Sequence, residues 1–274
     1  MWNKAKKLGV ELINDQVVDV QFNYREDIFT IKTSSNTFFK STYVIGAYGK
    51  RATLDKNLKR SFSLNKSPWL AVKAHYAANF SAETVALHNF SGGYCGLSKV
   101  ENNKVNACYL AHYDSFKKYK DIQGFQENVL YQNPHLKHFF ENAVPIFDKP
   151  ITISQINFEK KNLIEDHIFM IGDAAGLIHP LCGNGMAMAI QSAQILCTLL
   201  INNYEENSLS RVEIEKLYGK QWNKAFSKRL YAGSVLQKVL LNHTFQKLAQ
   251  KVASILPSIV PTIIKQTHGK PLVC

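Results

Sequence analysis

Residues 168–193 constrain the fold of this chain more than any other segment. They open with the continuous apolar run Ile168-Phe169-Met170-Ile171, which is typical of a strand buried on both faces. The small-residue turn Gly172-Asp173-Ala174-Ala175-Gly176 follows, and a long helix is expected from about 183 to 202. A strand, a glycine turn and a helix in this order predict an α/β fold in which a ligand approaches the backbone at the carboxyl edge of a sheet.

The turn carries groups that suit a polar ligand. Asp173 can accept hydrogen bonds from sugar-like hydroxyls, and its small neighbours let a cofactor approach the backbone. Pro180 fixes the entry to Gly183-Asn184-Gly185, and the helix that follows points its first N–H groups back at the turn. Such a helix end favours a bound anionic or electron-rich group. The alternative is a glycine turn that only packs a strand against a helix.

This string resembles the second FAD motif of the p-hydroxybenzoate-hydroxylase-like flavoproteins. That group includes aromatic monooxygenases, flavin halogenases and geranylgeranyl-reductase-like enzymes. The resemblance implies that Asp173 binds the ribityl chain of FAD, and that the backbone of residues 183–186 faces the pyrimidine edge of the isoalloxazine ring. The implied cofactor contacts are Gly172, Asp173, Ala174, Pro180, Gly183, Asn184, Gly185 and Met186.

A second segment supports the same resemblance. Residues 44–52 are similar to the strand and turn in which the family usually reads isoleucine, glycine, alanine, aspartate, glycine, basic residues and serine. Here Tyr48 stands at the aspartate position and Ala52 at the serine position. Roughly 125 residues separate this turn from Gly172-Asp173, as the family requires, so the resemblance covers residues 5–205.

The family's first motif, GxGxxG after a strand, does not occur in the sequence. Gly92-Gly93-Tyr94-Cys95-Gly96 has the wrong spacing and no helix after it. Compared with the family, the chain looks truncated, split between two genes or degenerate, and weak or no FAD binding is expected of it alone, because this motif cradles the FAD diphosphate. A partner that carries the missing unit could restore binding. The alternative is a non-catalytic remnant or an assembly subunit.

The expected fold is α/β, with a partial Rossmann-like FAD-binding domain interleaved with an antiparallel substrate-binding sheet and followed by C-terminal helices. Residues 1–60 form the partial FAD-binding domain, 61–160 the substrate-binding β-rich domain, 161–205 the FAD-binding strand, turn and helix, and 206–274 a helical region. Strands are expected at 10–13, 17–22, 28–33, 37–41, 69–76, 84–90, 92–100, 105–113 and 151–158. Helices are expected at 115–142 and 211–255. After residue 255, Pro257 and Pro261 break the helical pattern.

Three further side chains lie near the expected site. Tyr94 matches the tyrosine of a substrate motif in geranylgeranyl-reductase-like enzymes and would line the substrate cavity, although a tyrosine in an antiparallel sheet can also simply pack. His179 would donate to flavin or substrate, or be a structural histidine in a tight loop. Cys182 would be a stabilised thiolate at a helix end or a small buried apolar residue.

Composition narrows the partners and the compartment. Lys and Arg exceed Asp and Glu by 33 to 21, which suits anionic partners, but the basic residues are scattered without the aromatic interleaving of a nucleic-acid module. We therefore expect no nucleic acid. The five cysteines form no CxxC pair, so neither a disulfide framework nor a metal site is expected. Cysteines of this kind favour the reducing cytoplasm, with peripheral membrane contact as an alternative. No signal peptide and no membrane span are expected.

The C-terminal helical pattern allows two interpretations. Residues 222–251 mix apolar positions with lysines and an arginine, as in helices that rest on an anionic membrane. Helices that cap the flavin domain explain the pattern equally well. The resemblance as a whole implies an FAD-dependent oxidoreductase, of monooxygenase or reductase type, that acts on a small hydrophobic organic substrate. NAD(P)H is the candidate electron donor.

Overall fold

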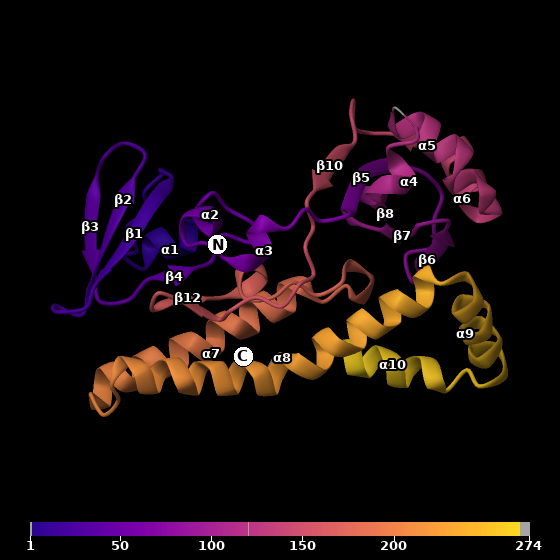
Figure 1. Ribbon diagram of the computed structural model, residues 1–274. Helices are drawn as coiled ribbons and strands as arrows, with labels where there is room; N and C mark the ends of the chain where they lie inside the picture. The colour runs from indigo at the N-terminus through magenta and orange to yellow at the C-terminus, as the bar shows by residue number, and fades with distance from the viewer. Residues whose placement is uncertain (1, 120, 269–274) are drawn as a thin grey trace.

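The computed structural model describes residues 2–119 and 121–268, which contain three sheets (Figure 1). The first sheet is an antiparallel meander in the order β1-β2-β3. Its strands are β1 (Val17–Asn23), β2 (Ile28–Thr33) and β3 (Phe38–Ser41). The helix α1 (Trp2–Lys7) precedes it, and the chain turns at Gly9 with φ +80°. The predicted strands at 17–22, 28–33 and 37–41 are confirmed.

The second sheet is the antiparallel one expected in the middle of the chain. Its order is β10-β5-β8-β7-β6, and β9 pairs with β5. The strands are β5 (Trp69–Ala77), β6 (Val85–Phe90), β7 (Gly93–Lys99), β8 (Lys104–His112), β9 (Val144–Pro145) and β10 (Ile151–Ser154). Alternate β5 residues are buried, because side chains on a strand point to opposite faces. One face packs on the short helices α4 (Tyr113–Phe116), α5 (Ile122–Asn128) and α6 (Pro134–Asn142).

The third sheet is short and positions the candidate site. It consists of β11 (Ile164–Glu165), β12 (Ile168–Met170) and β4 (Ile45–Gly46), in that order. β12 pairs with β4 in parallel, with Phe169 opposite Ile45. The helices α2 (Leu54–Asn57) and α3 (Ser61–Leu64) follow β4. Since parallel strands end at the same edge, the turns after β4 and β12 meet there.

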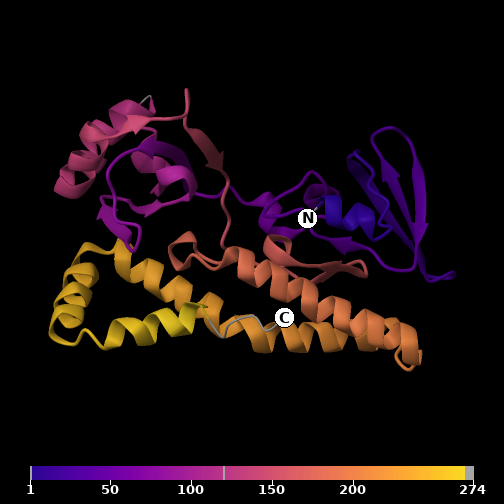
Figure 2. The ribbon, with the colours of Figure 1, turned by 180° about the vertical axis from the view of Figure 1, so that it is seen from behind.

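Four helices form the last part of the chain that the structure describes, up to residue 268. They are α7 (Gly185–Glu206), α8 (Arg211–Leu241), α9 (His243–Ile255) and α10 (Ile259–His268). Figures 1 and 2 show α7 and α8 side by side along the molecule, with α9 at the far end of α8 and α10 returning beneath it. Ser210 and Glu213 form a capping box that starts α8.

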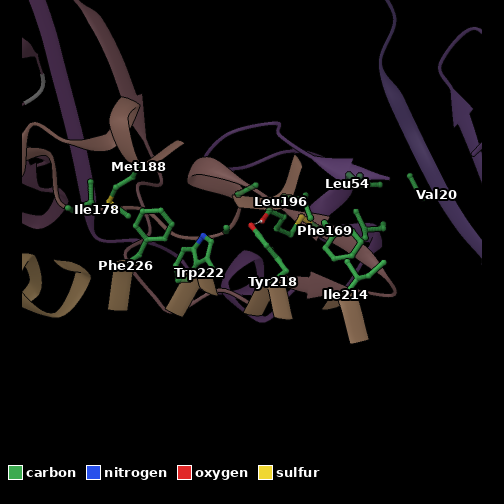
Figure 3. Packing of buried hydrophobic residues seen from close by; sticks show 14 of the residues in the cluster. Val20, Leu54, Phe169, Ile178, Met188, Leu196, Ile214, Tyr218, Trp222 and Phe226 are labelled. Atoms are coloured by element: carbon green, nitrogen blue, oxygen red, sulfur yellow. Dashed lines mark hydrogen bonds between the residues drawn. The ribbon is translucent and has the colours of Figure 1, made fainter. Parts of the chain in front are cut away.

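The main core lies between the short sheet and α8. Ile214, Tyr218, Trp222 and Phe226 recur every four residues on α8, so they share one face, and all four are buried. Figure 3 shows this row beneath Phe169. The Tyr218 hydroxyl donates to the Met170 carbonyl over 2.5 Å. A single helix face therefore supports the strand that leads into the candidate site.

Several element boundaries differ from the sequence prediction. Residues 10–13 form no strand, and β10 ends at Ser154 instead of continuing to 158. The predicted helix 115–142 is divided because Asp121 and Asn133 cap new helices, with Pro134 at the first position of α6. Asn242 divides the predicted helix 211–255 in the same way.

One further correction concerns the C-terminal half. Pro261 does not end helical structure but lies in the first turn of α10, where its missing N–H costs no hydrogen bond.

Within the described residues, α7 is long and apolar enough to cross a membrane by length and composition. Polar residues such as Gln191 and Gln194 interrupt it, so it contains no continuous apolar run of that length, as the sequence predicts. Met188 and Leu196 of α7 pack into the main core.

Candidate functional site

The turns after β4 and β12 enclose a cavity of about 480 Å³. Its walls come from the first turn (Ala47, Gly49), from the segment after β12 and from the start of α7. The lining residues are Ala47, Gly49, Ile171, Gly172, Asp173, Leu177, Ile178, His179, Pro180, Gly183, Asn184, Gly185, Met186 and Ala189. Two segments about 125 residues apart in sequence thus form one site.

Seven of the eight predicted cofactor contacts line this cavity. They are Gly172, Asp173, Pro180, Gly183, Asn184, Gly185 and Met186. Ala174 does not line it: its side chain is fully buried, and its carbonyl accepts a hydrogen bond from Arg60 at 3.0 Å. The lining residues Ala47, Gly49 and Ala189 were not predicted as contacts. The sequence features that could have indicated them are the family-like segment 44–52 and the alanine positions of the helix after residue 183.

Two glycines give the cavity its shape. Gly172 has φ +59°, and a Cβ there would lie 3.2 Å from the Ala189 Cβ. Gly183 has φ +62°, the left-handed conformation that glycine adopts at low cost, and it opens onto free space. The backbone before α7 is therefore accessible to a ligand.

Asp173 is half-buried with its carboxylate at the cavity. Burial raises the pKa of this carboxyl, and the positive charges of Lys161 and Lys50 oppose that effect. Within the described residues, no hydrogen bond reaches the Asp173 carboxylate oxygens. They can therefore accept hydrogen bonds from ligand hydroxyls.

The Lys161 side chain connects the backbones of the two turns. Its ammonium group donates to the Lys50 carbonyl at 2.8 Å and to the Asp173 carbonyl at 2.7 Å. The side chain is 4% exposed, and burial lowers its pKa to about 8. A buried amine that bonds both backbone turns holds them at a fixed separation.

Arg60 forms a second buried connection that the sequence did not reveal. Its guanidinium pairs with Asp55 at 3.0 Å and with Glu165 at 3.2 Å, and also donates to the carbonyls of Asn162 and Ala174. Tyr48 donates to Asp55 at 2.7 Å and accepts from Arg60 at 3.0 Å. The residue at the family's aspartate position therefore belongs to a structural network in this chain.

Of the two predicted substrate-lining residues, His179 lines the cavity and Tyr94 does not. His179 lines the cavity, stacks on Phe158 with ring centroids 4.0 Å apart, and has a pKa lowered by burial to about 4. It is therefore a neutral imidazole at physiological pH. Tyr94 lies in β7, is 3% exposed, and its hydroxyl accepts a hydrogen bond from the Leu181 N–H at 3.2 Å. This contact joins the antiparallel sheet to the cavity wall.

Cys182 follows the second of its two predicted alternatives. It is buried, and burial raises the pKa of its thiol to about 11, so no thiolate forms at neutral pH. Cys95, Cys108, Cys182 and Cys197 are free thiols, while Cys274 lies outside the described residues. Within the ranges 2–119 and 121–268, no cluster of three or more His, Cys, Asp or Glu could hold a metal ion.

A second cavity of about 640 Å³ lies behind the site. It is lined by residues 158–164, by the chain after β12 and by α8, with Lys161, His179 and Trp222 among its walls. His179 therefore borders both cavities. The first cavity has Gly172, Gly183 and the free Asp173 carboxylate. The second is lined by Gly176, and the carboxylate in its wall, that of Glu159, accepts hydrogen bonds from Asn65 at 3.2 and 3.1 Å.

Comparison with known proteins agrees with this geometry. The FAD-binding domain family matches residues 18–212, and the chain belongs to that family. Conditioned medium factor receptor 1 of Dictyostelium discoideum is 25% identical over 225 residues, which cover 77% of this chain and 43% of that protein. Digeranylgeranylglycerophospholipid reductase of Methanococcus vannielii is 31% identical over 102 residues, which cover 34% of this chain and 26% of that protein.

The fold is shared with solved flavoproteins. The structure of CmlS, a flavin-dependent halogenase, is similar with a TM-score of 0.69 at 16% identity, over 84% of this chain and 43% of the halogenase. The match spans less than half the length of CmlS and of each curated relative. The α/β fold with antiparallel sheets and C-terminal helices is therefore confirmed as that of FAD-dependent halogenases and monooxygenases.

The residues of the first cavity fit part of FAD. Asp173 has unpaired acceptor oxygens for hydroxyls, and the backbone at Gly183 and Gly185 is open because neither glycine has a close neighbour. Aligned N–H groups at the start of α7 favour an electron-rich ring edge. This donor and acceptor set suits the ribityl chain and ring edge.

Proposed function

We propose that this chain provides the flavin edge and the substrate-binding part of an FAD-dependent oxidoreductase. The observation that carries the proposal is the cavity in which the Asp173 carboxylate and the glycine backbone before α7 converge. When bound, FAD supplies the redox chemistry of such an enzyme. The protein supplies position and electrostatics. Asp173 accepts hydrogen bonds from ligand hydroxyls, and the α7 N–H groups stabilise negative charge on the ligand.

The proposed substrate is a hydrophobic organic molecule. The second cavity, which adjoins the first at His179, has an apolar wall that includes Leu163, Leu177 and Leu230. The neutral His179 can donate or accept a hydrogen bond without bringing charge into this environment. The name of the Methanococcus relative, a phospholipid reductase, favours a lipid-like substrate and a reductase reaction. We further propose NAD(P)H as the electron donor and the cytoplasm as the compartment.

We propose that full affinity for FAD requires a further strand and helix that complete the short sheet of β11, β12 and β4. β4 is the end strand of its sheet, and Ile45 at this edge is exposed. The outward face of α7 carries an exposed stripe, the α7 stripe, formed by Met186, Ile190, Cys197, Ile201 and Tyr204. A strand beside β4 followed by a helix on the α7 stripe would bury both surfaces. The unit that grips the FAD diphosphate, in the same polypeptide or in a partner, fits this description.

A titration with FAD tests the proposed function. The purified chain is titrated while quenching of flavin fluorescence is followed, and weak saturable binding is expected. Asp173→Ala should weaken binding by about tenfold, since hydrogen bonds to a charged group are lost. The matched control is Asp148→Ala, which removes an exposed carboxylate that lines neither cavity and should bind like wild type. Equal affinity of the Asp173 variant and wild type would contradict the proposal. Absence of saturable binding by wild type at high micromolar FAD would mean that the cavity binds flavin only together with the unit that grips the diphosphate.

A further inference from the structure

The helices α9 and α10 expose a continuous set of large apolar side chains. On α9, Phe245, Leu248, Val252 and Ile255 follow the i, i+3, i+7, i+10 spacing that places residues on one helix face. The set, called the apolar row below, comprises Phe245, Leu248, Val252, Ile255, Leu256, Val260, Ile263 and Ile264, and each of them is exposed. Phe245 is 56% exposed and Ile255 is 68% exposed. A row of this size is more than isolated surface hydrophobes.

The charged residues on the helices that carry the apolar row are all basic. No Asp or Glu occurs in the sequence from residue 216 to the end, whereas ten Lys and Arg residues do. Lys238, Lys247, Lys251 and Lys265 are exposed, and none of them forms an ion pair within the described residues. Lys247 and Lys251 lie beside the row on α9, so their aliphatic stems can lie along apolar surface while the ammonium groups extend outward.

We propose that α9 and α10 form a docking surface for an anionic membrane. The apolar row enters the boundary between headgroups and acyl chains, and the flanking lysines lie at the level of the lipid phosphates. Figures 1 and 2 show that these helices end the molecule on the side of α8 opposite the meander. The occupant is assigned by charge complementarity, because a surface with lysines and no carboxylates is attracted to anionic lipid.

One of these helices, α10, reaches the candidate flavin site. The Asn184 side chain, which lines the first cavity, donates to the carbonyls of Thr267 at 3.2 Å and His268 at 2.8 Å, at the end of α10. The docking element therefore forms part of the support of the cavity wall. A docked membrane would also narrow the substrate class of the proposed function to a membrane lipid with a long apolar chain. This assignment of the substrate rests on the proposed function. Docking itself does not depend on flavin binding.

Vesicle sedimentation with the full chain tests the docking surface. The probes are vesicles of phosphatidylcholine alone and vesicles in which phosphatidylserine replaces part of it. The chain should sediment with the anionic vesicles only, and less at high salt. Leu248→Glu combined with Ile255→Glu should weaken binding at least about tenfold, as should Lys247→Glu combined with Lys251→Glu. Val85→Glu, which changes an exposed apolar residue of β6, is the matched control and should bind like wild type.

Three results would overturn the docking surface. They are no sedimentation with anionic vesicles, equal sedimentation of the apolar-row variant and wild type, and equal binding to neutral and anionic vesicles. If the apolar-row variant instead converts a dimer to a monomer in sedimentation velocity, the row is an interface between copies of the chain. Circular dichroism of each variant verifies the fold. The FAD titration of the same variants separates the two proposals, because wild-type FAD affinity with lost vesicle binding leaves the proposed function intact.

Discussion

Lys161 links the protonation of one buried amine to the separation of the two turns that enclose the cavity. Its ammonium group bonds the carbonyls of Lys50 and Asp173, and burial lowers its pKa to about 8. The sequence offered no sign of this role. A lysine in a run of charged residues is usually solvated. Only the fold brings Lys161 into contact with both turns.

The depressed pKa makes the stability of the chain depend on pH. The unfolded chain keeps the Lys161 proton up to a pKa near 10.5, whereas the folded chain releases it near 8, so the unfolded state binds more protons between these values. The contribution of Lys161 to the free energy of unfolding therefore rises with pH across this window, by about 3 kcal/mol. Urea unfolding of wild type and Lys161→Met at several pH values measures it. A difference between the two proteins that stays constant with pH would refute this.

At the scale of elements, the contact between α8 and the turn after β12 is closely packed. A Cβ added to Gly176 would lie 3.0 Å from Trp222 Cη2 and 3.2 Å from Cζ2, and Trp222 is held in the buried row of α8. Gly176→Ala should therefore destabilise the chain by about 1–3 kcal/mol through overpacking. Gly219 in α8 has no atom within 4 Å of such a Cβ, so Gly219→Ala should stabilise it by about 0.5–1 kcal/mol. Denaturant midpoints compare the pair, and equal signs would contradict this packing.

The sequence predicted elements where local pattern decides and missed them where distant partners do. The meander, the antiparallel strands and the strand, turn and helix at 168–206 follow from periodicity and glycine position. Helix boundaries failed at Asp121, Asn133 and Asn242, whose side chains cap new helices. The Arg60 network could not be predicted, because its partners Glu165 and Ala174 lie 105 and 114 residues away in sequence.

At the scale of the whole molecule, two separate exposed apolar surfaces suit different binding partners. The α7 stripe and the edge of β4 lie beside the flavin cavity, which suits a strand and helix that complete the sheet. The apolar row on α9 and α10 is surrounded by lysines, which suits an anionic membrane. The sequence had indicated both a missing unit and a basic amphipathic region. Only the fold shows that they are separate surfaces and that Asn184 connects one of them to the cavity.

Hydrogen exchange of the backbone amides, measured with and without excess FAD, tests the flavin site most directly. The account predicts slower exchange in peptides that contain residues 47–49, 172–173 and 183–186, because these line the first cavity. Asp173→Ala should reduce that protection. Protection confined to residues 158–164 and 222–234, which line the second cavity, would contradict the account, as would unchanged exchange at saturating FAD.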